Sequence, residues 1–154
     1  MKLKRFKNYQ ELSGFAASEI ANSIKDKPSL VLCMASGETP KLTVELLVRK
    51  LKEEKIDHSR ITFIGLDEWV GLLPSNTGSC HYFFQHKLIA PLQLKASQYL
   101  LFDALADDLN NECEKMDTFI NDKDGIDIML VGIGMNGHIG FNEPGASFSN
   151  LSHV

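Results

Sequence analysis

The sequence predicts an α/β fold with three layers, in which helices cover both faces of an open, mostly parallel sheet. Two features indicate this fold: short continuous apolar runs alternate with amphipathic helical patterns, and loops rich in glycine or acidic residues follow the apolar runs. Such runs are typical of strands that are buried on both faces of a parallel sheet. We therefore expect a Rossmann-like arrangement with right-handed crossovers, whose functional loops gather where the strands end.

The chain begins with a predicted helix and strand. Residues 8–25 place apolar side chains on one stripe, and Asn8 and Glu11 have the spacing of a capping box, so this segment predicts a helix that ends before Pro28. Residues 29–35 form a short continuous apolar run, which indicates a buried strand.

A second helix and a second strand are expected next. Thr39 is a suitable N-cap and Pro40 suits the first helical position, so we expect a helix over residues 41–54. Residues 61–66 then predict another buried strand.

The rest of the chain continues this alternation. A loop-rich region precedes a helical pattern over residues 82–89, a further helix is expected over residues 105–119, and residues 126–131 predict a strand. No repeat or linker interrupts the order, and 154 residues is the length of one typical domain. We therefore expect residues 1–154 to form a single domain.

Composition and charge narrow the class of protein. Hydrophobic residues make up 44% and charged residues 23% of the chain, as in ordinary globular proteins, and no apolar stretch is long enough to span a bilayer. The net charge of −4 and the dispersed lysines argue against nucleic acid as a partner. The basic amino terminus lacks the apolar core of a secretory signal, so we expect a cytoplasmic protein.

The three cysteines, Cys33, Cys80 and Cys113, are odd in number and far apart. This spacing argues against a disulfide framework and against a Cys-x-x-Cys metal or redox site, and it fits a reducing compartment. We expect all three to act as small buried hydrophobic residues.

Residues 36–40, Ser-Gly-Glu-Thr-Pro, join a predicted strand to a predicted helix. A helix amino terminus attracts anions through its free N–H groups, Ser36 and Thr39 add hydroxyl donors, and Gly37 lets a ligand approach the backbone. These residues form a candidate phosphate loop, although not a Walker A loop, because the Gly-Lys-Ser/Thr ending is absent. A helix cap followed by an ordinary turn explains the same residues equally well.

Two adjacent carboxylates, Asp67 and Glu68, follow the second predicted strand. Alternation of side chains would send one of them into a pocket, where it could serve as a general base, and the other away from it. A solvated acidic turn is the simpler alternative. We expect the neighbouring Trp69 to pack against protein rather than to form a platform for substrate.

Residues 132–137, Gly-Ile-Gly-Met-Asn-Gly, satisfy the Gly-x-Gly-x-x-Gly pattern of dinucleotide-binding proteins. That fingerprint requires a helix directly after the glycines and an acidic residue about twenty positions further on. The chain ends too soon for this, and Pro144-Gly145 would interrupt a helix. Gly132 and the following glycines are therefore expected to shape a loop around a small substrate.

The same loop carries His138 between Asn136 and Glu143. A histidine with a carboxylate close in sequence suggests coupled proton transfer, whereas an isolated histidine is more often structural. His-Glu-x-x-His, other clustered metal ligands and Gly-x-Ser-x-Gly are all absent from the sequence. We expect acid–base chemistry that uses no metal and no redox cofactor.

Three motifs together resemble the glucosamine-6-phosphate deaminases, also called isomerases, which share a superfamily with the 6-phosphogluconolactonases. Residues 36–40 resemble their phosphate loop, residues 66–72, Leu-Asp-Glu-Trp-Val-Gly-Leu, resemble their Leu-Asp-Glu-Tyr-Val-Gly-Leu segment, and residues 137–144, Gly-His-Ile-Gly-Phe-Asn-Glu-Pro, are close to their signature. Lactonases instead resemble Gly-His-Thr-Ala-Ser-Leu-Phe-Pro at the last motif. Glu143 therefore favours the deaminase branch.

The resemblance implies conversion of glucosamine 6-phosphate and water to fructose 6-phosphate and ammonia. It makes Asp67 the base that moves a proton between C2 and C1, and it makes His138, helped by Glu143 and Asn136, the group that opens the sugar ring. It implies that Ser36, Gly37, Thr39 and Gly132 bind the substrate and its phosphate. The implied partner is a small-molecule sugar phosphate, without nucleic acid or membrane, and a homo-oligomer is compatible with the resemblance.

Several alternatives stay open from the sequence. Galactosamine 6-phosphate is the nearest other substrate, and a 6-phosphogluconolactonase or a non-catalytic sugar-phosphate sensor are the other functions. Some family members carry aspartate where this chain has Asn136. Family members are usually much longer, so the resemblance implies that the chain lacks their carboxy-terminal part.

Overall fold

The computed structural model describes residues 2–154 and contains a parallel sheet of four strands in the order β3-β2-β1-β4. The register places Leu32 beside both Phe63 and Ile128. The strands are β1 (Val31–Met34), β2 (Thr62–Gly65), β3 (Tyr99–Leu100) and β4 (Ile128–Leu130). The predicted parallel α/β fold is therefore confirmed.

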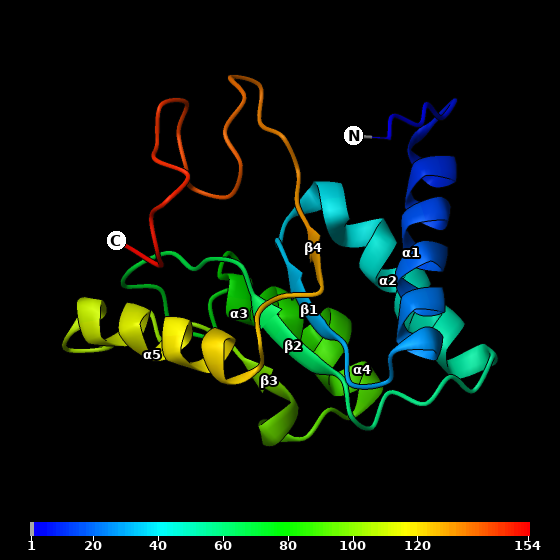
Figure 1. The fold of residues 1–154 in the computed structure, drawn as a ribbon, viewed down its shortest axis with the longest axis horizontal. Helices are drawn as coiled ribbons and strands as arrows, with labels where there is room; N and C mark the ends of the chain where they lie inside the picture. Colours follow the sequence, from blue (N-terminus) through cyan, green and yellow to red (C-terminus); the bar gives the residue numbers. More distant parts are fainter. Residues whose placement is uncertain (1) are drawn as a thin grey trace.

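Helices lie on both faces of this sheet (Figure 1). On one face α1 and α2 pack side by side, together with a continuous helical segment made of α3, a π-helical turn at Gln85–Ile89 and α4. On the other face lies α5. The helices are α1 (Tyr9–Asp26), α2 (Glu38–Glu53), α3 (Cys80–Phe84), α4 (Ala90–Leu92) and α5 (Leu109–Asp122). None of the helices in residues 2–154 has the length and apolarity that a bilayer-spanning helix requires.

The alternation of side chains along β1 divides the hydrophobic core into two parts. Leu32 and Met34 point toward α1 and α2, whereas Val31 and Cys33 point toward Met116 of α5. All four residues of β1 are buried, which explains why this strand appears in the sequence as a continuous apolar run.

Two helix starts differ from the sequence prediction. Helix α2 begins at Glu38, with Gly37 as its N-cap, so the prediction that Thr39 caps the helix is wrong. Gly37 has φ +107°, a conformation that glycine adopts easily, and the chain therefore turns before Thr39. In addition, the hydroxyl of Tyr9 lies 2.8 Å from the carbonyl oxygen of Glu38, which ties α1 to this first turn.

Helix α5 begins at Leu109, later than predicted, because the side chain of Asp108 accepts a hydrogen bond from the backbone N–H of Asn111 and caps the helix there. The short strand β3 was not predicted. It has only two residues, and its pairing with Phe63 and Ile64 of β2 rather than any local periodicity defines it.

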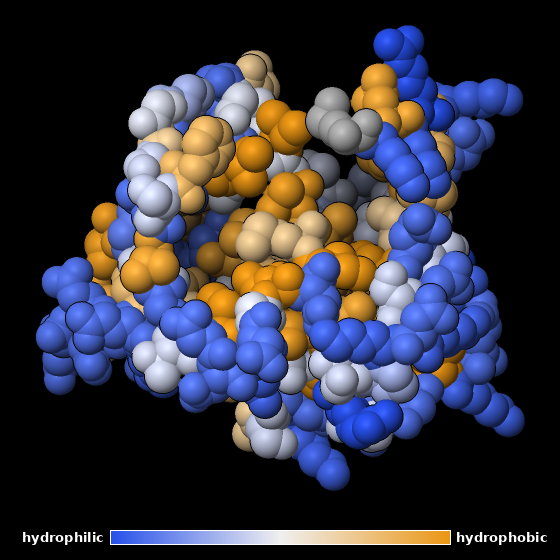
Figure 2. Space-filling model, in the orientation of Figure 1, coloured by the Kyte–Doolittle hydropathy of each residue, from blue (hydrophilic) through white to orange (hydrophobic). Residues whose placement is uncertain are grey.

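Strand β4 is at an edge of the sheet and is less buried than β1 and β2. Met129 points to the same face as Cys33 but is 48% exposed and is not part of the core cluster around Met116 of α5. Figure 2 shows hydrophobic residues gathered in the middle of this view, between the C-terminal loops and α1.

The centre of the core provides a prediction on stability. Phe63 is 0% exposed and its ring centroid lies 4.8 Å from that of Phe84. Phe63→Ala is expected to lower the free energy of unfolding by about 3–5 kcal/mol, because it removes the ring and leaves a cavity. Denaturant unfolding measures this change. Phe148→Ala, at a fully exposed phenylalanine, is the matched control and should change stability by less than about 0.5 kcal/mol; equal effects would contradict the assignment of the core.

Candidate active site

Three loops that follow β1, β2 and β4 meet at the carboxyl edge of the sheet. A Cβ atom added to Gly132 would lie 3.8 Å from Cγ2 of Thr39, and one added to Gly140 would lie 3.5 Å from Oδ2 of Asp67. The rings of Trp69 and Phe141 are in contact, with their centroids 4.4 Å apart and their planes tilted by 48°. The structure therefore confirms that loops 36–40, 67–71 and 132–145 converge, and it shows Trp69, which is 52% exposed, in contact with Phe141.

Asp67 is the half-buried carboxylate of this region. It follows β2 directly, and its Oδ1 lies 3.7 Å from the Sγ atom of Cys80 at the start of α3. Burial raises the pKa of Asp67, the hydrogen bond from Cys80 opposes this, and the charge of Glu68 adds to the increase. A carboxylate with a raised pKa is suited to accept a proton and return it.

Glu68 has a different task from its neighbour. Its carboxylate accepts hydrogen bonds from the backbone N–H groups of Cys80 at 3.0 Å and His81 at 2.7 Å. These N–H groups belong to the first turn of α3 and have no partner within the helix. Glu68 therefore anchors α3 behind the loop, and Asp67 is the member of the pair that is free for chemistry.

His138 is the end of a short chain of hydrogen bonds. Its Nδ1 atom lies 2.7 Å from Oδ1 of Asn136, whose Nδ2 donates to Oε2 of Glu143 at 2.5 Å. Because a carboxylate only accepts, the amide nitrogen must face Glu143, which leaves the amide oxygen for the imidazole. That oxygen requires a proton on Nδ1, so in the neutral imidazole the lone pair is on Nε2. The structure thus brings together the three residues that the sequence placed in one loop.

The imidazole of His138 occupies the space above Gly134. A Cβ atom at Gly134 would lie 2.1 Å from Cε1 of the ring, which no side chain tolerates. The backbone N–H of Gly134 also donates to the carbonyl oxygen of His138 at 2.8 Å. Gly134 is therefore required for the position of the ring rather than for approach to a nucleotide.

Gly134→Ala is accordingly expected to displace the His138 ring and to reduce any activity that depends on it by about 10²-fold. Gly14→Ala is a control outside the loop, at a glycine of α1 whose φ is not positive and whose added Cβ meets no atom within 4 Å. The measurement is the steady-state rate together with the thermal midpoint of each variant. A Gly134→Ala protein that keeps its full rate would show that this ring position is not needed.

Loop 36–40 is arranged around the first turn of α2. Gly37 and Thr39 are exposed, and their backbone lies where α2 has free N–H groups. Ser36 instead donates its hydroxyl to Sγ of Cys80 at 3.0 Å. Cys80 is the residue of this region that the sequence prediction overlooked: like Cys33 and Cys113 it is free and buried, as expected, but it also contacts Asp67 and Ser36.

The chain after β4 does not form the helix that a dinucleotide fingerprint requires. Residues 131–154 contain turns and one isolated bridge between Ile139 and Asn142. The glycine pattern at residues 132–137 therefore lacks the helix of a dinucleotide site, and the role of Gly132 in a substrate loop stays a prediction. Within residues 2–154, histidine, cysteine and acidic side chains do not gather into a group of three that could hold a metal ion.

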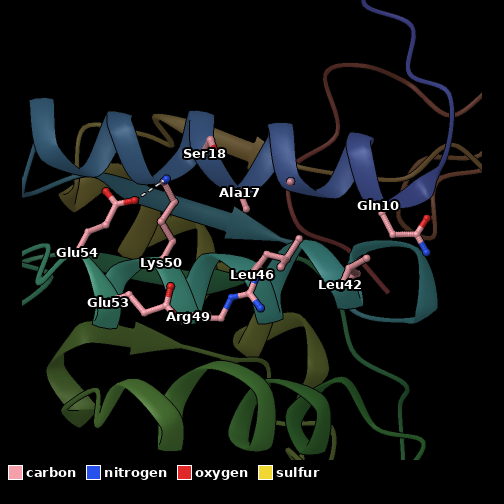
Figure 3. A pocket seen from close by; sticks show the side chains of 10 residues that line it. Gln10, Ala17, Ser18, Leu42, Leu46, Arg49, Lys50, Glu53 and Glu54 are labelled. Atoms are coloured by element: carbon pink, nitrogen blue, oxygen red, sulfur yellow. Dashed lines mark ion pairs between the residues drawn. The ribbon is translucent and has the colours of Figure 1, made fainter.

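A groove of about 430 Å³ lies elsewhere, between α1 and α2 (Figure 3). Ala17 and Leu46 line it together with charged residues such as Arg49 and the ion pair of Lys50 with Glu54. It contains none of the residues from the three loops. Asp67 and His138, each of which is hydrogen-bonded to a neighbouring side chain, lie at the carboxyl edge of the sheet. We therefore place the candidate active site there.

Comparison with known proteins identifies the family of the chain. Residues 6–141 match the profile of the family described as glucosamine-6-phosphate isomerases/6-phosphogluconolactonase. Glucosamine-6-phosphate deaminase from Bacillus velezensis is 43% identical over 96% of this chain and 61% of its own length. Glucosamine-6-phosphate deaminase 1 from Bacillus subtilis is 39% identical over 100% of this chain and 64% of its own length. The chain thus spans 61–64% of the length of these relatives.

Solved structures give the same result. A monomeric glucosamine-6-phosphate deaminase of the NagB superfamily superposes with a TM-score of 0.92 and 39% identity over 97% of this chain and 62% of that chain. A 6-phosphogluconolactonase from Thermotoga maritima, at 18% identity, shares the fold with a TM-score of 0.73 over 91% of this chain and 62% of that chain. The parallel sheet, the three converging loops and the family match lead to one conclusion: the chain belongs to the family of glucosamine-6-phosphate isomerases and 6-phosphogluconolactonases.

Proposed function

We propose that this protein is an amino-sugar phosphate deaminase that converts glucosamine 6-phosphate and water to fructose 6-phosphate and ammonia. The observation that carries the proposal is the meeting of a half-buried Asp67 with the loop that holds the His138–Asn136–Glu143 hydrogen-bond chain. Deamination of an aldose by isomerisation needs two such groups, one for ring opening and one for proton transfer between carbons. Glu143 and the similarity to deaminases favour this branch over the lactonases.

Ring opening is the task that the structure supports for His138. Its Nε2 lone pair can take the proton of the anomeric hydroxyl, and the resulting imidazolium can protonate the ring oxygen as the C1–O5 bond breaks. The Nδ1 atom keeps its proton throughout, because Asn136 offers it only an acceptor. Glu143 accepts a hydrogen bond from the amide of Asn136 and so keeps the amide oxygen turned toward the imidazole of His138.

Proton transfer between carbons is the task of Asp67. Its carboxylate removes the proton from C2 of the open-chain sugar and returns it to C1, while the C1 oxygen gains the proton that the ammonium group on C2 loses. This leaves a hydroxyl on C1 and a protonated imine at C2. Water adds to this imine, and ammonia then leaves C2 as the ketone forms. The half-buried carboxylate with a raised pKa supports both directions of this transfer. The reaction so written requires neither a metal ion nor a redox cofactor.

Loop 36–40 is the proposed binding site for the substrate phosphate. The free N–H groups at the start of α2 and the hydroxyl of Thr39 offer donors, Gly37 leaves the approach open, and Gly132 borders the loop from β4. Ser36 would join these donors by exchanging its bond to Cys80 for one to the phosphate. The substrate class and the free cysteines together favour a cytoplasmic place of work.

The test is ammonia release from glucosamine 6-phosphate by purified protein of verified mass. Galactosamine 6-phosphate and 6-phosphogluconolactone are run in parallel, with calorimetric titration of each ligand. Release of ammonia from glucosamine 6-phosphate supports the proposal. Faster release from galactosamine 6-phosphate would assign that epimer as the substrate instead. Hydrolysis of the lactone without ammonia would assign the lactonase activity instead. Saturable binding without any turnover by folded protein would favour a sugar-phosphate sensor.

A further inference from the structure

Cys80 connects two parts of the candidate active site that are far apart in the sequence. Its Sγ atom lies 3.0 Å from the hydroxyl of Ser36 in the phosphate loop and 3.7 Å from Oδ1 of Asp67. Ser36 donates to the sulfur, and the thiol in turn donates to the carboxylate. The three side chains therefore form one chain of hydrogen bonds from loop 36–40 to Asp67.

We propose that Cys80 is a positioning residue, whose thiol donates a hydrogen bond that holds Oδ1 of Asp67 and links this carboxylate to the phosphate loop through Ser36. The inference rests on the proposed role of Asp67 as the base. With Oδ1 held in this way, Oδ2 is the oxygen that receives the proton from the sugar. Oδ2 faces Gly140, and a Cβ atom added to Gly140 would lie 3.5 Å from Oδ2. The absence of this Cβ leaves room for the sugar to approach Oδ2.

The surroundings of Cys80 keep it in the protonated, donating form. Its side chain is buried in the core beside Phe84, and burial raises the pKa of the Cys80 thiol to about 12. Its position is fixed, because Glu68 accepts the hydrogen bond from its backbone N–H. Cys80 therefore keeps its proton at neutral pH and can donate it in a hydrogen bond to Asp67.

Few other titratable groups act on Asp67 in the described residues. Glu68, in the same loop, raises the pKa of Asp67 through its charge. The charge of Asp67 in turn helps to raise the pKa of the Cys33 thiol in β1. Glu68 disfavours the charged form of the Asp67 carboxylate, and Cys33 does not stabilise it. The S–H donor of Cys80 is the side-chain contact that favours it.

The test compares Cys80→Ala and Cys80→Ser by following the 13Cγ shift of Asp67 as a function of pH in the intact chain. Removal of the donor in Cys80→Ala should shift the Asp67 midpoint upward, whereas Cys80→Ser, which keeps a donor in nearly the same place, should stay closer to wild type. Cys113→Ala and Cys113→Ser, at a buried cysteine of α5 without contact to Asp67, are matched controls and should leave the midpoint unchanged.

An unchanged midpoint in Cys80→Ala, or equal shifts in Cys80→Ala and Cys80→Ser, would overturn the proposal. The titration does not depend on turnover, so a protein that releases no ammonia would refute the proposed function without deciding the role of Cys80. With turnover, Cys80→Ala should lower kcat about fivefold at constant KM and move the acidic limb of the pH profile upward. The loss should shrink in a Ser36→Ala background, because both residues belong to one chain of hydrogen bonds.

Discussion

Replacement of Asp67 by asparagine is expected to lower turnover of glucosamine 6-phosphate by about 10²–10⁴-fold while substrate binding stays nearly unchanged. The amide has almost the size of the carboxylate and still accepts a hydrogen bond from Cys80, but it cannot take a proton from C2. Ammonia release measures the first effect, and calorimetric titration with the substrate measures the second. Full turnover by Asp67→Asn would remove this residue from the mechanism.

Stability provides the control for this variant. Burial raises the pKa of Asp67 above its ordinary value of 3.8, so between these two pKa values the folded protein binds more protons than the unfolded chain. Stability then falls as pH rises through this window, and the loss persists at neutral pH. Asp67→Asn should therefore have a higher Tm than wild type at pH 7 and a smaller difference at low pH. A lower Tm at pH 7 would contradict the raised pKa.

The raised pKa of Asp67 also determines how activity depends on pH. Asp67 acts as a base only when it has lost its proton, and activity should therefore rise as pH increases through its raised pKa. The acidic limb of kcat/KM is expected above pH 3.8, the ordinary value for this group. In Asp67→Asn the acidic limb of kcat/KM should disappear if the residual reaction of this variant does not need a base.

Replacement of His138 by glutamine is expected to lower turnover of the cyclic substrate by about 10²–10⁴-fold. Glutamine can still bond to Asn136, but it cannot exchange a proton with the anomeric hydroxyl and the ring oxygen. The measurement compares glucosamine 6-phosphate with an analogue that cannot close into a ring. The analogue should react at nearly the wild-type rate, because its ring needs no opening and Asp67 is intact.

The matched control for this variant is His153→Gln, at an exposed histidine whose Nδ1 contacts only the carbonyl oxygen of Leu151. His153→Gln should leave the turnover rates of glucosamine 6-phosphate and of the open-chain analogue unchanged. Equal losses on the cyclic sugar and its open-chain analogue in His138→Gln would count against ring opening as the task of His138. Such a result would instead indicate a role in the carbon proton transfer or in binding.

Much of the fold followed from local patterns in the sequence. The apolar runs at residues 29–35 and 61–66 contain the central strands β1 and β2, in which every residue is buried, and the stripe in residues 8–25 is the helix α1 with Asn8 as its cap. These elements could be predicted because burial on both faces and amphipathic periodicity are properties of contiguous residues. Strand β3 could not, because two residues have no periodicity and depend on pairing with β2.

The candidate site divides in the same way. The Asn136–His138–Glu143 chain was predictable because its members are close in sequence on one loop with glycines at the turns. The different tasks of Asp67 and Glu68 were not, since adjacent carboxylates look alike in a sequence and only the position of α3 makes Glu68 an anchor. Cys80 was hidden for the same reason: its two polar contacts come from Ser36 and Asp67, on other loops.

The sequence by itself thus determined the parallel α/β class, the family and the three loops for which we propose a role in the chemistry. Tertiary structure decided the start of α2 at Gly37, the place of Gly134 beneath the His138 ring and the link from Ser36 through Cys80 to Asp67. Periodicity and motif spacing are local and can be read along the chain. Contacts between loops depend on strand order and on how closely the backbone segments approach, and these are fixed only when the sheet has formed.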